Sequence, residues 1–368
     1  MRKPLLFVLA LLLSFSVFLV GCGSSSSQST GAGKEPAPAP TPQTPKEGQD
    51  FKGTGQVTVY TAFLEDEAAR IFGEFEKTSG IKVKFVRLSA GEIQTRLKAE
   101  KNNPQASVWF GGSTDTFISA AGDGLLEKFT PKGSDKLPKE YVDKDSNWTP
   151  VSIGAIAFAS NTDWLAKNNL QPPQSWEDLL KPEFKGNVTM AHPATSGTSF
   201  TTLATLIQLK GGEDQGFQYF EKLDKNIRQY TKSGAAPVRM AGLGETGVGI
   251  CFTQDILSTK EQGFPITMSF PKEGTGYEVS AAALIKSGPA GEVENAKKFI
   301  EWSISKGAQD LLKDSFRLPV NPEAVLAKGA LKLSDIKVIS YNAQWAGEHR
   351  SDLLGKFDSK IKGKESAK

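Results

Sequence analysis

The fold is decided by residues 57–121, which read VTVYTAFLEDEAARIFGEFEKTSGIKVKFVRLSAGEIQTRLKAEKNNPQASVWFGGSTDTFISAA. Three β-prone runs, at 57–60, 81–86 and 106–110, alternate with stretches in which apolar residues recur at helical spacing. The order strand, helix, strand, helix, strand, helix is typical of a parallel β-sheet with helices on its faces. This region therefore predicts an α/β fold.

Beyond residue 150 the chain again alternates between expected strands and helices, with longer segments between the strands. The strands that we expect here are 152–159, 187–190, 248–252 and 279–285. The helices that we expect are 199–209, 214–223, 292–305 and a C-terminal region at about 334–359. No internal repeat of fixed short period is present, and the length suits two lobes of ordinary domain size.

The first 22 residues predict export. Arg2 and Lys3 precede an apolar run at 5–20, which is shorter than a comfortable membrane span, and Gly21-Cys22 follows it. This pattern is typical of a bacterial lipoprotein signal peptide (1–22), in which Cys22 becomes the acylated first mature residue. We expect a protein held by lipid on the extracytoplasmic face of the cell membrane. An uncleaved anchor, or an ordinary signal peptide with a chance cysteine, is the alternative.

Residues 23–51 contain mainly Ser, Pro, Gly and Thr with almost no apolar side chains. Such a segment cannot bury enough surface to offset the entropy lost on ordering. We therefore expect a disordered tether between the lipid anchor and the folded part of the chain.

Composition excludes several classes of protein. The 44 basic and 41 acidic residues nearly balance, which argues against a nucleic-acid partner. Once Cys22 is acylated only Cys251 remains, so neither an intramolecular disulfide nor a cysteine-based metal site is expected. With two histidines, His192 and His349, and no hydrolase motif, we predict no catalytic residues, no metal and no cofactor.

Hydroxyl-rich junctions follow three expected strands and mark a candidate anion site. Thr61 follows the first strand, Ser113 follows the third, and HPATSGTS (192–199) precedes a helix. Ligands of open parallel sheets bind at the carboxyl ends of strands, where helix N-termini offer free N–H groups to phosphate or carboxylate. Plain helix capping favours the same residue types. Three such junctions in one chain favour a ligand site.

The segment TKSG (231–234) adds a cation and two hydroxyls, and Arg239 follows it. Either cation could hold an anion or lie on a solvated surface. GLGETG (242–247) has dinucleotide-loop spacing but precedes a strand instead of following one, so we interpret it as a turn.

Together these features resemble the solute-binding lipoproteins of ABC transporters, in the group with ferric-iron, thiamine, aminoethylphosphonate and sugar-phosphate receptors. The resemblance covers about residues 55–325. The segments that carry it, in order, are VTVYTA (57–62), HPATSGTS (192–199), QYTKSGAAPVRMAGLGE (229–245), VGICFTQD (248–255) and EVSAAALIKSGPAGEVENAKKFIEWSISKGAQDLL (278–312).

The resemblance implies a type II-like periplasmic-binding-protein fold with crossover strands near 152–160 and 279–285. Lobe one would comprise 52–152 and 280–368, and lobe two would comprise 153–279. A monomer would capture its solute in the cleft between the lobes and close around it by hinge motion.

The resemblance further implies delivery of the solute to an ABC permease in the membrane. Iron-binding members use adjacent tyrosines, but the matching stretch 251–255 has none. The segments TSGT (195–198) and TKSG (231–234) resemble those of organophosphate and phosphonate receptors, so a small phosphorylated or phosphonate solute is our first hypothesis. The alternatives are ferric iron or an iron chelate, then thiamine or its phosphate. A lipid-anchored enzyme and a ligand-presenting sensor are the competing classes.

The expected ligand contacts fall into three groups. The anionic head would be bound by Thr195, Ser196, Gly197, Thr198 and Ser233, with Lys232 and His192 as further donors. Lobe one would contribute Thr61, Ser89 and Ser113. Asp255 and Glu278 would repel phosphate, so they should meet hydroxyl or amino groups at the other end of the solute.

Overall fold

The computed structural model describes residues 51–361. The predicted signal peptide, the lipidated Cys22 and nearly all of the tether lie outside this range. Within 51–361, no helix combines the length and the hydrophobicity that crossing a bilayer requires.

Lobe one starts with the alternation that the sequence predicts. Its first elements are β1 (Gln56–Thr61), α1 (Glu65–Ser79), β2 (Lys82–Arg87), α2 (Ala90–Ala99), β3 (Val108–Ser113) and α3 (Thr114–Gly122). β1 pairs in parallel with both β2 and β3. α1 buries Ile71, Phe72 and Phe75 and ends at Gly80, whose φ of 81° allows the left-handed turn that closes the helix. The predicted α/β fold is confirmed.

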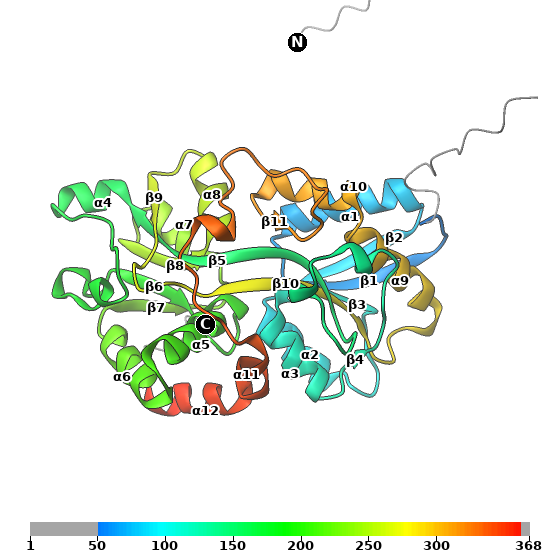
Figure 1. Ribbon diagram of the computed structural model, residues 1–368, viewed down its shortest axis with the longest axis horizontal. Helices are drawn as coiled ribbons and strands as arrows, with labels where there is room; N and C mark the ends of the chain where they lie inside the picture. The colour runs from blue at the N-terminus through cyan, green and yellow to red at the C-terminus, as the bar shows by residue number, and fades with distance from the viewer. Residues whose placement is uncertain (1–50, 362–368) are drawn as a thin grey trace, which may run out of the picture. The chain divides into compact units, whose positions relative to one another are not determined.

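Two antiparallel strands link the lobes, as expected near 152–160 and 279–285. They are β5 (Thr149–Asn161) and β10 (Tyr277–Ile285), which lie side by side across the middle of the molecule (Figure 1). β5 is buried at all of its 13 positions. The sheet runs β2-β1-β3-β10-β5-β8-β6-β7, so β5 is the strand at which one lobe's sheet continues into the other's.

Lobe two follows β5. Its strands are β6 (Val188–Ala191), β7 (Ile227–Thr231), β8 (Val248–Phe252) and β9 (Ile266–Ser269). Its helices are α4 (Thr162–Lys167), α5 (Gly197–Lys210), α6 (Glu213–Asp224), α7 (Ala236–Gly242) and α8 (Thr253–Glu261). β6 pairs in parallel with β7 and β8, whereas β9, which the sequence did not reveal, pairs antiparallel with β5.

Each lobe has its own aromatic core. In lobe one, Phe72 and Phe75 pack edge-to-face on Phe299 of α9 (Val293–Ser303). In lobe two, Phe158 packs on Trp176, both fully buried. Burying each such side chain contributes about 1.5–3 kcal/mol, which gives the walls of any cleft between the lobes a rigid support.

The C-terminal region, which was expected to belong to lobe one, also packs against lobe two. After α10 (Lys306–Asp310) and the short β11 (Leu318–Pro319), the chain forms α11 (Ala343–Glu348) and α12 (Arg350–Lys360). Leu353 and Phe357 of α12 are buried in the core of lobe two, where Phe357 packs edge-to-face on Phe220. The division into lobes remains a prediction, and the last helices contact both lobes: α12 completes the core of lobe two, while Gly347 of α11 lies directly against Ile118 of α3 in lobe one.

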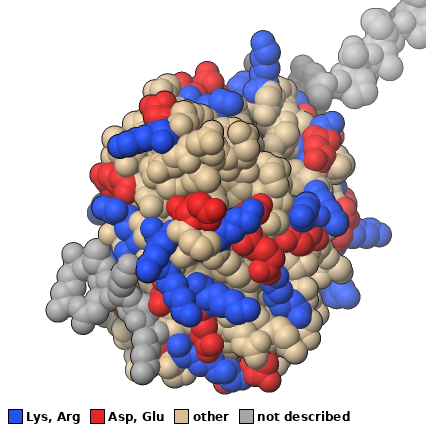
Figure 2. Space-filling view, turned by 90° about the vertical axis from the view of Figure 1, so that its left-hand side faces the viewer, with Lys and Arg blue, Asp and Glu red and all other residues tan. Residues whose placement is uncertain are grey.

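The surface of lobe two agrees with the balanced composition. In the face shown in Figure 2, acidic and basic side chains lie among one another. This face therefore does not present the single basic surface that nucleic-acid binding would require.

Candidate ligand-binding site

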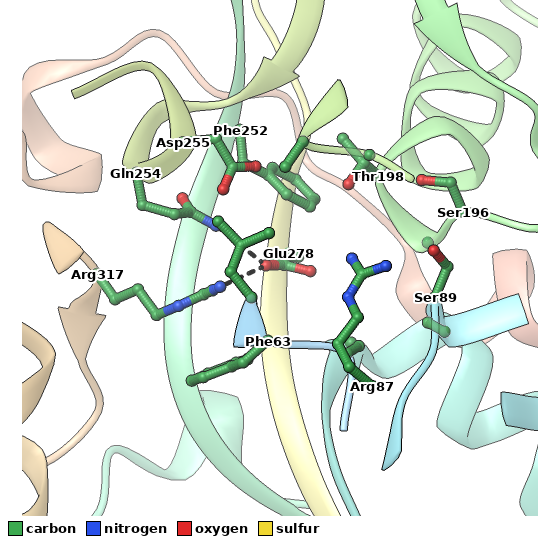
Figure 3. Close-up of a pocket in the computed structure, with 17 residues that line it drawn as sticks. Phe63, Arg87, Ser89, Ser196, Thr198, Phe252, Gln254, Asp255, Glu278 and Arg317 are labelled. Atoms are coloured by element: carbon green, nitrogen blue, oxygen red, sulfur yellow. Dashed lines mark hydrogen bonds and ion pairs between the residues drawn. The ribbon is translucent and has the colours of Figure 1, made fainter. Parts of the chain in front are cut away.

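A cavity lies between the lobes, at the carboxyl ends of β1 and β2 and the N-termini of α2 and α5. Side chains of both lobes and of the crossover strand β10 line it (Figure 3). It adjoins a larger outer cavity of about 800 Å³, and the two share wall residues such as Arg87, Asp255 and Arg317.

One side of this cavity presents hydroxyl groups at two helix N-termini. Ser89 precedes α2 in lobe one, where it forms a capping box with Glu92, and its Oγ is buried without a hydrogen bond of normal geometry. Ser196 precedes α5 in lobe two, where its Oγ accepts a 3.4 Å bond from the N–H of Ser199, and Thr198 lies in the first turn. Free N–H groups and the positive end of the helix dipole favour an anion at such positions.

Arg87 brings a positive charge to the same side. It is the last residue of β2, and its Nη2 donates a 3.0 Å hydrogen bond across the cleft to Oγ of Ser233. Its Nε is buried without a partner. Burial lowers the pKa of the guanidinium, which nevertheless stays charged because an arginine pKa starts above 12. An unsatisfied, desolvated donor of this kind favours an anionic ligand.

Two carboxyl groups occupy the cavity wall away from these hydroxyls. Figure 3 shows Arg87, Ser196 and Thr198 on one side of Glu278, with Asp255 on the other. Glu278 is buried and Asp255 is half-buried, and desolvation raises the pKa of Asp255 to about 6 and that of Glu278 to about 8. Carboxyl oxygens accept hydrogen bonds from hydroxyl or amino groups, so the cavity has two chemically different ends.

Six of the expected contacts line this one cavity: Ser89, Ser196, Gly197, Thr198, Asp255 and Glu278. Ser233 lines the adjoining outer cavity, where its hydroxyl is already bonded to Arg87. Their direct contact with a solute stays a prediction.

The two remaining lobe-one residues have their hydroxyls engaged elsewhere. Oγ1 of Thr61 accepts a 3.2 Å bond from the N–H of Phe63, and Oγ of Ser113 donates a 2.9 Å bond to Asp115. Neither residue lines the cavity, although their neighbours Ala62 and Gly112 do. In this geometry both side chains shape the turns behind the wall, and their direct contact with a solute stays a prediction.

Three expected lobe-two donors also lie away from the cavity. Oγ1 of Thr195 donates to the carbonyl oxygens of His192 and Lys232, and the Lys232 side chain is exposed. The His192 ring packs edge-on against Phe357, with Nε2 at 3.4 Å from Asp358 of α12. Its burial lowers the pKa of the imidazole. His192 thus joins the C-terminal helix to lobe two, a role that local sequence does not reveal.

Three further residues line the cavity that were not expected from the sequence: Arg87, Gln254 and Arg317. Arg87 could have been found, because it ends a strand two residues before Ser89, where the rule for parallel sheets places ligand contacts. Gln254 lies beside Asp255 at the start of α8. Arg317 gave no signal, since it lies in an irregular segment just before the two-residue strand β11.

No group of three or more His, Cys, Asp or Glu side chains arranged to hold a metal ion occurs within the described part of the chain. Cys251 is fully buried in β8, and its pKa is raised well above the usual value by burial. A buried thiol of this kind is unreactive.

Residues 70–336 match the family described as bacterial extracellular solute-binding protein. The chain belongs to this family, whose two-lobed fold and interlobe cavity are those described above. It is a solute-binding protein of the class that serves ABC importers, and its relatives are binding proteins.

Three similar proteins carry informative names. The structure of the periplasmic binding protein AfuA from Actinobacillus pleuropneumoniae, with fructose-6-phosphate bound, is 36% identical with a TM-score of 0.80, covering 84% of this chain and 99% of that one. A putative 2-aminoethylphosphonate-binding periplasmic protein of Salmonella typhimurium is 28% identical over 68% of this chain and 73% of its own length. The ferric binding protein from Campylobacter jejuni (24% identity, TM-score 0.69, covering 83% of this chain and 99% of that one) shares the fold.

Proposed function

We propose that this protein captures a small phosphorylated or phosphonate-bearing solute in the interlobe cavity and delivers it to an ABC permease. The observation that carries the proposal is the buried, unpartnered Nε of Arg87 beside the N-termini of α2 and α5. An anionic head would satisfy this donor and would accept a hydrogen bond from the hydroxyl of Ser89. In this proposal the protein acts as a monomer that acylated Cys22 tethers to the outer face of the membrane.

The other end of the cavity favours a head group attached to hydroxyls or an amine. Asp255 and Glu278 would receive hydrogen bonds from those groups while standing apart from the anionic head. Sugar phosphates and aminoalkyl phosphonates both have this two-ended character. The bound fructose-6-phosphate in the 36% identical AfuA structure makes a phosphorylated sugar our first choice.

The test uses the protein without residues 1–22, purified without refolding. Native mass spectrometry should show a co-purified mass that matches a phosphorylated or phosphonate metabolite, and calorimetry should show binding of fructose 6-phosphate. Bound iron with a visible charge-transfer band, and no binding of phosphorylated solutes, would overturn the proposal.

A substitution localises the site. We expect Ser196→Glu to abolish binding, because it places a negative charge where the anionic head should lie. Ser305→Glu is the matched control: Ser305 also caps a helix, α10, through a bond from the N–H of Ala308, but it does not line the cavity. Equal affinity of Ser196→Glu and the unmodified protein would show that the anion binds elsewhere.

A further inference from the structure

Arg317 is held in a buried frame at the edge of the cavity. Its Nε and Nη2 donate hydrogen bonds of 2.8 and 3.2 Å to the two carboxylate oxygens of Glu67 on α1. The guanidinium carbon lies 3.7 Å from the centroid of the Phe63 ring, which packs beneath it. Both members of the ion pair are less than a tenth exposed. The orientation of Arg317 is thus fixed from two sides by lobe one.

The remaining nitrogen of Arg317 faces Glu278. Nη1 lies 3.8 Å from Oε1 of Glu278, and Nε2 of Gln254 donates a 3.3 Å bond to the same oxygen (Figure 3). One carboxylate oxygen of Glu278 therefore accepts a hydrogen bond from Gln254 and forms an ion pair with Arg317. Figure 3 shows the other oxygen on the side of the cavity where Arg87 lies.

We infer that Arg317 is a positioning residue that holds the buried carboxyl group of Glu278 as a hydrogen-bond acceptor for the far end of the solute. The identity of that solute rests on the proposed function. Arg317 acts through Glu278, because Glu67 accepts hydrogen bonds from its Nε and Nη2 while its Nη1 faces Glu278.

The charges around Glu278 predict that substitutions of Arg317 and of Glu67 shift the pKa of Glu278 in opposite directions. The charged groups that act on Glu278 are Arg317, Asp255 of α8 and Asp115 of α3; burial and the two acids raise its pKa, while Arg317 lowers it. Glu67, in turn, holds Arg317 on the far side. Removing the charge of Arg317 should raise the pKa of Glu278 further. Removing the charge of Glu67 should lower it, because Arg317 then has Glu278 as its nearest acidic partner.

The first arm of the experiment needs no solute. The ¹³C chemical shift of the Glu278 carboxyl carbon, assigned with Glu278→Gln, is followed from pH 5 to 10 in the ligand-free protein. We expect a midpoint near 8 in the unmodified protein, a higher one in Arg317→Met, a lower one in Glu67→Gln and an intermediate one in Arg317→Lys. An unchanged midpoint in Arg317→Met, or shifts of the same sign in Arg317→Met and Glu67→Gln, would overturn the inference.

The second arm measures binding by calorimetry at pH 9, above the expected midpoint of about 8, where Glu278 of the unmodified protein is mostly ionised. Loss of a hydrogen bond to a charged group weakens binding roughly tenfold to a hundredfold. We expect a loss of this size for fructose 6-phosphate in Arg317→Met, with inorganic phosphate, which reaches only the anion end, changed by less than about threefold. Equal losses for the two probes would show a general structural role and contradict the inference.

Two provisions keep these outcomes separate. Arg317→Met leaves Glu67 buried without its partner and could impair folding. If Arg317→Met does not fold, the titration and the calorimetry are carried out on Arg317→Lys and on the double variant Glu67→Gln/Arg317→Met, which removes both charges. If the unmodified protein does not bind fructose 6-phosphate, the proposal that its solute is a phosphorylated sugar is contradicted. The carboxyl titration still decides the role of Arg317.

Discussion

The backbone N–H of Gly91 in lobe one donates a 2.9 Å hydrogen bond to the carbonyl oxygen of Thr195 in lobe two. Gly91 is the second residue of α2, and Thr195 precedes the Ser196 that caps α5. The two helix N-termini that form the anion end of the cavity are therefore joined directly. A side chain at Gly91 would collide with the carbonyl oxygen of Ala194, so only glycine permits this approach.

We expect Gly91→Ala to weaken solute binding by at least roughly tenfold, because a methyl group here holds the lobes apart and the closed state is less populated. Calorimetry gives the affinity, and small-angle scattering of the solute-saturated protein gives the degree of closure. Gly73→Ala is the control: Gly73 lies inside α1 with open space around it, so alanine should leave affinity unchanged. Normal affinity and closure in Gly91→Ala would contradict the importance of this contact.

Arg87→Met should weaken binding of an anionic solute roughly tenfold to a hundredfold, the effect of losing a charge-assisted hydrogen bond of about 1.5–3 kcal/mol. This loss should change little with salt concentration, because the Nε of Arg87 is buried and salt screens buried charges weakly. Lys232→Met removes a neighbouring exposed cation and should have no effect. A comparable loss in both variants, measured by calorimetry, would point to a diffuse surface field.

The raised pKa of Glu278 predicts a pH-dependent stability. Its folded-state pKa of about 8 lies above its ordinary value of 4.5, so the folded protein binds more protons than the unfolded chain between these values. Stability should therefore fall as pH rises through this window. Glu278→Gln should flatten that slope in urea unfolding measured from pH 5 to 8.5. An identical slope in parent and variant would show that Glu278 is ionised throughout.

A second buried acid, Asp115, joins α3 to the other lobe. One of its oxygens accepts hydrogen bonds of 3.0 Å from Thr201 of α5 and 2.9 Å from Tyr341, and Nη1 of Arg350 lies 4.0 Å from the other. Asp115→Asn should cost about 3–5 kcal/mol in the free energy of unfolding, because it leaves the Arg350 charge buried without an acid. The exposed Asp145→Asn should change stability by less than about 0.5 kcal/mol. A loss below 1 kcal/mol in Asp115→Asn, measured by urea unfolding, would refute this reading.

The sequence predicts the regular elements well, because helical and strand periodicities act over short distances. β5 and β10 appear close to the expected 152–160 and 279–285, and α5 begins at Gly197 within the hydroxyl-rich run. The site is only partly predictable. Junction residues such as Ser89 and Ser196 follow from the rule that ligands bind at the ends of parallel strands. The same rule does not say whether a junction side chain points into the cavity or, like Ser113, hydrogen-bonds to a neighbouring residue.

Long-range packing accounts for the rest. Arg317 reaches Glu67 across 250 residues of sequence, and no local pattern announces that pair. The ring of His192 contacts Phe357 of the last helix, so its role depends on where α12 packs. Such contacts are set by the tertiary fold, which single-sequence periodicity does not contain.

The placement of α12 has a consequence for how the polypeptide matures. β3 pairs with β10, which lies some 170 residues downstream, so this pairing cannot form until β10 has been synthesised. The core of lobe two likewise lacks Phe357 until almost the whole chain is available. Neither half can therefore reach its native state on a growing chain, and the contact pattern is strongly non-local, which slows folding. A newly made chain therefore completes its native core only after α12 has been synthesised.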